Sequence, residues 1–125
     1  MEVKWVNIPN NVKAYYTEKE FEEIQANFNG KAEYENGEII LASNTSIKHN
    51  LIKGNILAAL IMYLKGSKCR AYDEQIEVIF KNESELHKYK PDVFVMCDNP
   101  EKQGESFLSP PKIIFEVISR RSANH

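Results

Sequence analysis

Apolar residues at three- and four-residue steps mark one long helix in the middle of the chain. They are Leu51, Ile52, Ile56, Leu57, Leu60, Ile61 and Leu64, with Ala58 and Ala59 widening the apolar face. This period is typical of an amphipathic helix that packs on another layer of structure. Ser43-Asn44-Thr45-Ser46 offers N-caps, and Gly66 stands at the favoured position after a helix end. The pattern predicts a helix over residues 47–64 that packs on a sheet.

A shorter helix and a hairpin are expected before it. Thr17-Glu18-Lys19-Glu20 is a capping box, with Glu three residues after Thr, and it predicts a helix to about Ala26. Asn36-Gly37 separates two strand-like segments within residues 31–41, which is a strong hairpin signal. Residues 1–13 are expected to form an extended lead-in.

Three strand-like segments follow the long helix. Apolar and polar positions alternate from Cys69 to about Phe80, which predicts one half-buried strand over residues 69–80. Two short runs rich in β-branched and aromatic residues, 92–97 and 113–118, predict buried strands. Polar turns or loops are expected at residues 81–85 and 98–103. The order of elements predicts an α+β fold with the long helix on one face of the sheet.

Composition places the chain among ordinary globular domains. It has 125 residues, of which 42% are hydrophobic and 27% charged, and a net charge of −2. A single domain over residues 1–125 is therefore expected. The weak charge gives no global reason to bind nucleic acid, so a local basic patch or a metal would have to hold phosphates. No apolar stretch is long enough to span a bilayer, which predicts no membrane partner.

The two cysteines predict a compartment. Cys69 and Cys97 lie in apolar, strand-like contexts without CxxC or Cys/His spacing. They are interpreted as reduced core residues, which predicts a reducing, cytoplasmic location.

Two acids stand at the edges of the last two apolar runs. Asp92 opens the first run and Glu116 lies within the second. Desolvating a carboxylate there is costly unless it is paired, protonated or bound to a metal. If the strands are neighbours, both carboxylates converge and suit Mg²⁺ or Mn²⁺, which can activate water against a phosphoryl group. The alternative is that Asp92 caps a turn after Pro91 and Glu116 meets an Arg or Lys.

His49 and Glu77 have competing interpretations. His49 lies one turn before Ile52 on the line of the apolar face, so it either packs on the sheet or lies at the rim of an acid cleft. Glu77 lies on the mixed face of its strand and is expected to be solvated or salt-bridged.

An ordered set of motifs over residues 17–119 resembles a known bacterial family. The motifs are Thr17-Glu18-Lys19-Glu20-Phe21, Glu33-Tyr34-Glu35-Asn36-Gly37-Glu38-Ile39, Ser43 and His49, Pro91-Asp92-Val93, Pro110-Pro111, and Glu116-Val117-Ile118-Ser119. Together they resemble the Uma-type putative restriction endonucleases. That family is similar in fold to the PD-(D/E)XK nucleases, whose core is α-β-β-β-α-β.

The resemblance implies roles for these residues. The helix at 47–64 would be the first core helix, and the three predicted strands would follow it. Asp92 and Glu116 would bind Mg²⁺ or Mn²⁺, with the Val117 carbonyl as a third donor. Glu33 would add a further acid, and His49 would join the catalytic group. The implied activity is metal-dependent hydrolysis of nucleic-acid phosphodiesters, with DNA as the expected substrate.

The chain also departs from the family pattern. The nuclease signature has a Lys two residues after the Glu, where this chain has Ile118. Family members supply a Lys from the next helix, but only residues 119–125 follow, so the last core helix and strand are expected to be missing. An uncovered sheet edge and apolar face favour a homodimer. Arg120 or Arg121 is an alternative source of the cation, although Arg cannot act as a base.

Three alternatives follow from these departures. The chain is an active nuclease domain, or a catalytically inactive remnant that serves as a dimeric interaction or nucleic-acid-binding module, or part of a longer gene product.

Overall fold

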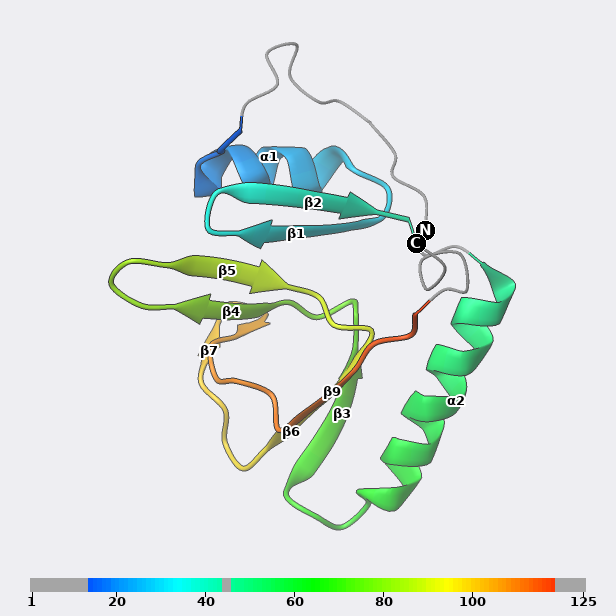
Figure 1. Ribbon diagram of the computed structural model, residues 1–125. Coiled ribbons are helices and arrows are strands. Elements are labelled where there is room, and N and C mark those ends of the chain that lie inside the picture. Colours follow the sequence, from blue (N-terminus) through cyan, green and yellow to red (C-terminus); the bar gives the residue numbers. More distant parts are fainter. Residues whose placement is uncertain (1–13, 44–45, 119–125) are drawn as a thin grey trace.

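The predicted order of helices and strands holds in outline in the computed structural model, which describes residues 14–43 and 46–118 (Figure 1). The elements are α1 (Glu18–Asn27), β1 (Lys31–Glu35), β2 (Glu38–Ala42), α2 (Ile47–Tyr63), β3 (Cys69–Asp73), β4 (Val78–Lys81), β5 (Leu86–Tyr89), β6 (Val93–Cys97), β7 (Lys102–Gln103), β8 (Ser106–Phe107) and β9 (Ile113–Phe115). The mixed α+β class is confirmed and is consistent with a restriction-endonuclease-like fold. The expected lead-in at 1–13, the caps at Asn44 and Thr45, and Arg120 and Arg121 lie outside the described residues.

The predicted capping box starts α1. The Thr17 hydroxyl accepts a hydrogen bond from the Glu20 N–H at 3.2 Å, and the Glu20 carboxylate accepts one from the Thr17 N–H at 2.8 Å. These reciprocal bonds satisfy N–H groups that have no partner within the helix. The prediction of this helix is confirmed.

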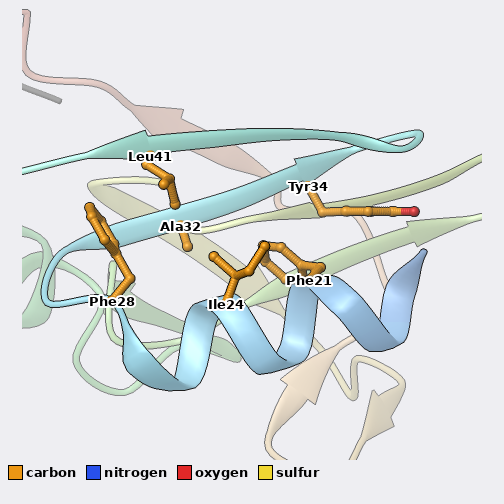
Figure 2. Packing of buried hydrophobic residues seen from close by; sticks show 6 residues of the cluster. All are labelled: Phe21, Ile24, Phe28, Ala32, Tyr34 and Leu41. Atoms are coloured by element: carbon orange, nitrogen blue, oxygen red, sulfur yellow. The ribbon is translucent and has the colours of Figure 1, made fainter. Parts of the chain in front are cut away.

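α1 packs on the predicted hairpin and forms the first core. Phe21, Ile24 and Phe28 of the helix segment lie against Ala32, Tyr34 and Leu41 of β1 and β2 (Figure 2). At the hairpin turn, Asn36 and Gly37 both take left-handed backbone angles, with φ of 48° and 102°. Asn and Gly adopt these angles at low cost, which is why this pair makes a two-residue hairpin.

The strands form two sheets. The larger has the order β2-β1-β5-β4-β8-β7, and the smaller has the order β3-β6-β9. A second core joins them, in which Phe94 and Met96 of β6 pack with Val78 of β4 and Phe107 of β8. Figure 1 shows α1 against the β1–β2 hairpin and α2 alongside the small sheet. The small sheet and α2 position the candidate site.

The prediction of one strand over residues 69–80 is wrong. β3 ends at Asp73, and β4 begins at Val78 in the other sheet. The Asp73 carboxylate accepts a hydrogen bond from the Gln75 N–H at 3.0 Å, and the Ile76 N–H donates to the Asp73 carbonyl at 3.1 Å. An aspartate that hydrogen-bonds the backbone two residues ahead favours a turn, which ends the strand here.

Several short strands were not predicted. β5 pairs with both β1 and β4, although residues 86–89 were not expected to be a strand. β7 and β8 form a small hairpin, and β7 occupies the last two residues of the segment 98–103, which was expected to be a loop. β5 pairs with the distant β1, and β8 pairs with the distant β4; local periodicity does not reveal pairings of this kind.

The prediction that Cys69 and Cys97 are reduced is wrong. The β3–β6 register places these residues directly opposite each other, with Cα atoms 4.0 Å apart, and their sulfurs form a disulfide. The two cysteines are separated by 28 positions in the sequence, so no short motif spacing predicts that they pair. The argument for a reducing compartment loses this support.

α2 packs on the small sheet, as predicted, and runs over residues 47–63 against the expected 47–64. His49 is its one buried residue, and Ile56, Leu57 and Leu60 are half-buried. Exposed apolar side chains remain on its other faces and on β9, which was expected to be buried and to reach Ile118. They include Leu51, Ile61, Met62, Tyr63, Ile113 and Ile114. Among the described residues no element covers these side chains, so an apolar surface is left open to solvent. None of the described helices is long and apolar enough to cross a membrane.

Candidate metal site at the end of the small sheet

The register of the small sheet brings acids from its three strands side by side. β3 pairs with β6 up to Asp73 opposite Val93, and β9 pairs with β6 up to Phe115 opposite Val93. One position further along each strand stand Glu74, Asp92 and Glu116. We call these three residues the acid row. The expected convergence of the two strand-edge acids follows from this register, and Glu74 adds a third.

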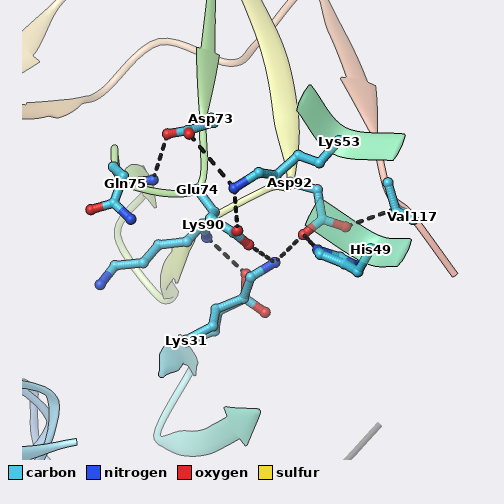
Figure 3. Close-up of polar contacts among 10 residues, drawn as sticks. Lys31, His49, Lys53, Asp73, Glu74, Gln75, Lys90, Asp92 and Val117 are labelled. Carbon is cyan, nitrogen blue, oxygen red and sulfur yellow. Dashed lines mark hydrogen bonds and ion pairs between the residues drawn. The ribbon is translucent and has the colours of Figure 1, made fainter. Parts of the chain in front are cut away.

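Asp92 is the buried centre of the acid row. Only 2% of its surface is exposed. Its Oδ1 accepts a hydrogen bond from the Lys31 Nζ at 2.8 Å, and its Oδ2 accepts one from the Val117 N–H at 2.7 Å (Figure 3). Burial acts to raise the pKa of Asp92, but these hydrogen bonds, together with the positive charge of Lys31, hold the pKa below its ordinary value. Asp92 is thus an ionised, paired carboxylate rather than a simple turn cap.

Two lysines balance the charge around Glu74. The Lys53 Nζ lies 2.8 Å from Glu74 Oε1, and the Lys31 Nζ lies 3.5 Å from Glu74 Oε2 (Figure 3). Burial acts to lower the pKa of each lysine, but the hydrogen bonds to Asp92 and Glu74 raise it above the ordinary value. Both ammonium groups are therefore charged at neutral pH.

Sequence reasoning did not single out Glu74, Lys31 or Lys53. Glu74 fell within the strand that was expected to continue to Phe80. A signal for the lysines does exist. Lys53 follows His49 by one helical turn, and Lys31 precedes Glu33 by two positions in a strand, so each shares a face with a residue that was predicted.

Glu116 and Glu33 border the acid row. Glu116 is exposed as a residue, yet partial desolvation of its carboxyl group, together with the charges of Asp92 and Glu33, raises its pKa to about 7 against the opposing charge of Lys31. The Glu33 carboxylate accepts a hydrogen bond from the Lys90 N–H at 2.7 Å, just before Asp92 in the chain. Glu33 therefore lies near the site and adds negative charge to it.

Val117 contacts the site through its N–H. That group donates to Asp92, as described above. The expected role of the Val117 carbonyl as a metal donor stays a prediction. Glu77 lies outside the site, since its carboxylate accepts a hydrogen bond from the Ser106 hydroxyl at 3.0 Å.

His49 faces Asp92 from the first turn of α2. Ser46 caps this helix by accepting the His49 N–H at 3.0 Å, which places the imidazole at the end of the sheet. The His49 Nε2 is buried, lies 3.6 Å from Asp92 Oδ1, and has no hydrogen-bond partner among residues 14–43 and 46–118. A buried polar atom without a hydrogen bond needs an explanation, and a bound ion is one that the neighbouring carboxylates support. The position fits the acid-cleft interpretation of His49.

The donors fit a divalent cation. His49, Glu74 and Asp92 each offer one ligand atom, and these atoms lie within 4.8 Å of one another. Carboxylate oxygens suit Mg²⁺ and Mn²⁺, and an imidazole nitrogen shifts the preference from Mg²⁺ toward transition metals. The buried His49 Nε2 is the observation that favours such an ion.

A pocket opens beside the acid row. Its volume is about 370 Å³, and it is lined by Phe28, Asn29, Gly30, Lys31, Glu74, Gln75 and Lys90. Lys31 and Glu74 thus belong both to the site and to the wall of this pocket. Glu74 is the member of the acid row that lines this pocket.

Comparison with protein families identifies the family of this chain. The model of the Uma2 family, described as "Putative restriction endonuclease", matches residues 18–125. Searches of curated proteins and of solved structures found no match. Because the family model covers nearly the whole chain, this protein belongs to the Uma2 family of putative restriction endonucleases.

Proposed function

We propose that this protein is a metal-dependent endonuclease domain that hydrolyses phosphodiester bonds of nucleic acid, with DNA as the expected substrate. The observation that carries this proposal is the buried, ionised Asp92 beside His49 Nε2, with Glu74 alongside; that nitrogen lies 3.6 Å from Asp92 Oδ1 and makes no hydrogen bond within the described part of the chain. Membership in the Uma2 family supports the reaction class.

The proposal gives each side chain a role. Asp92, Glu74 and His49 would hold the cation, and Glu116 or the Val117 carbonyl would complete its ligand set. A bound Mg²⁺ or Mn²⁺ would polarise the phosphoryl oxygen and favour ionisation of a water. Where the Val117 carbonyl fills that position, Glu116 would be free to accept a proton from the attacking water. Glu33 would support this geometry through its bond to the Lys90 backbone.

A metal titration and a cleavage assay test the proposal. Calorimetry with Mn²⁺ should show binding to the unmodified protein and its loss in Asp92→Ala. Cleavage of a supercoiled plasmid with Mn²⁺ should be lost in Glu116→Gln. Glu105→Gln is a matched control, because Glu105 is exposed and lies between β7 and β8. Mn²⁺ binding that survives in Asp92→Ala would contradict the assigned site.

An inactive interaction module is the second candidate function. The exposed apolar side chains of α2 and β9 favour it, since surfaces of this kind mark association sites. In this case a homodimer forms through α2, and Ile61→Glu converts the dimer to a monomer in light scattering. If the unmodified chain cleaves a plasmid and Glu116→Gln abolishes this cleavage, an inactive module is ruled out.

The proposed substrate implies a cytoplasmic location. The Cys69–Cys97 disulfide argues in the opposite direction, because structural disulfides are uncommon in reducing compartments. Rapid alkylation of thiols in intact cells, followed by mass spectrometry, distinguishes the two. Two alkylated cysteines are expected for a cytoplasmic protein.

A further inference from the structure

Lys31 reaches the acid row from the other sheet. It lies at the start of β1, whereas the acid row belongs to the small sheet. Its side chain is only 11% exposed, and its Nζ lies between Asp92 Oδ1 at 2.8 Å and Glu74 Oε2 at 3.5 Å (Figure 3). A positive charge therefore stands between two of the candidate metal ligands.

Lys31 contacts the oxygen of Asp92 that also lies nearer to His49 Nε2. Asp92 Oδ1 is the atom that lies 3.6 Å from His49 Nε2. A divalent cation binds carboxylate oxygens at roughly 2.0–2.6 Å. With the ammonium on the same oxygen, the two cations would be only a few ångströms apart in a poorly hydrated site. Like charges at such a separation repel strongly.

We propose that the Lys31 ammonium fills the cation position of this site in the metal-free protein, and that a divalent cation binds only by displacing it. The inference rests on the proposed metal site and adds a positioning residue that regulates its loading. Lys31 is the built-in competitor of the metal.

The structure provides a place for the displaced side chain. Lys31 already lines the 370 Å³ pocket, together with Asn29, Gly30, Gln75 and Lys90. A lysine side chain has a flexible four-carbon stem, so its ammonium can move by several ångströms without movement of the backbone. Gly30 and Lys31 can thus keep their backbone positions while the ammonium leaves Asp92.

The test compares Mn²⁺ affinities by calorimetry at neutral pH. Removing a competing group raises the apparent affinity by the inverse of the fraction of competent protein. Lys31→Met, which keeps the length of the side chain without its charge, should bind Mn²⁺ at least about tenfold more tightly than the unmodified protein. Lys90→Met is the matched control, because it removes the same charge from the same pocket. The Mn²⁺ affinity of Lys90→Met should change less than about threefold, because the Lys90 charge acts on the site only at long range.

A stability measurement gives a second readout. Without metal, Lys31→Met should melt at a lower temperature than the unmodified protein, because Asp92 loses its hydrogen bond and ion pair with Lys31. Saturating Mn²⁺ should raise its melting temperature more than that of the unmodified protein. If Lys31→Met does not fold, Lys31→Gln replaces it with the same expected direction.

The outcomes separate this inference from the proposed function. Suppose that the unmodified protein binds Mn²⁺, that Asp92→Ala abolishes this binding, and that Lys31→Met binds Mn²⁺ equally well or more weakly. This result overturns only the role of Lys31. An equal gain in Lys90→Met also overturns it, since charge alone would then explain the effect. Absence of Mn²⁺ binding from the unmodified protein and from Lys31→Met overturns the metal site as well.

Discussion

Replacing Asp92 by Asn tests whether the site is held by charge. The substitution keeps the size of the side chain and removes one negative charge at a position that is 2% exposed. In the native protein both carboxylate oxygens accept hydrogen bonds, one from Lys31 and one from the Val117 N–H. An amide has only one oxygen, so its NH₂ group must face one of these two donors.

The expected loss of stability follows from these contacts. Removing one partner of a buried ion pair costs about 3–5 kcal/mol. Lys31 keeps Glu74 at 3.5 Å, which places the cost at the lower end of that range. Relief of repulsion between Asp92 and the other acids offsets a further part. We therefore expect Asp92→Asn to lower the free energy of unfolding by about 2–3 kcal/mol at neutral pH.

Urea unfolding followed by circular dichroism measures this change. Asp73→Asn is the matched control in the adjacent strand, because Asp73 is partly exposed and its ion pair with Lys53 is longer, at 3.7 Å. Its cost should stay below about 1 kcal/mol. An Asp92→Asn protein that is as stable as the unmodified one, or more stable, would refute the reasoning, because repulsion within the acid row would then outweigh the contact with Lys31.

Three further predictions concern other parts of the chain. Because the pKa of Glu116 is raised from 4.5 to about 7, the stability that its proton uptake contributes is complete below pH 4.5 and lost as the pH rises through 7. Urea midpoints across this range should fall with pH, and the fall should be smaller in Glu116→Gln. Gly30→Ala should cost about 2 kcal/mol in unfolding free energy, because an added Cβ would lie 2.7 Å from the Ala42 carbonyl oxygen; normal stability would contradict this steric argument. Reduction of the Cys69–Cys97 disulfide should lower the free energy of unfolding by about 3 kcal/mol, measured with and without dithiothreitol, and an unchanged melting curve would contradict it.

Local sequence signals were sufficient for the helices and the first hairpin. The capping box at Thr17 and the Asn36-Gly37 turn each act over a few residues, so their structures follow from nearby atoms. The apolar period of α2 also predicted its length to within one residue. Signals of this kind do not depend on the rest of the fold.

Pairing between distant segments accounts for the main errors. The alternation over residues 69–80 is the same whether the chain continues straight or turns at Asp73. The hydrogen-bonded turn at Asp73 and the pairing of β3 and β4 in different sheets decide this. The same holds for Cys69 and Cys97, which are brought together by the β3–β6 register. β9 was expected to be buried, but a strand is buried only when another element covers it. Ile113 and Ile114 are exposed, because no described element covers them.

The sequence by itself determined the helices, the hairpin turn and two acids of the site, because caps, turns and buried carboxylates carry local chemical signatures. Only the tertiary structure decided that Glu74 joins Asp92 and Glu116 in one row, and that Lys31 crosses from the other sheet to neutralise it. The physical reason is that the free energy of a charged group depends on its burial and on the neighbouring charges, and a sequence does not give either. Strand register sets both for this site.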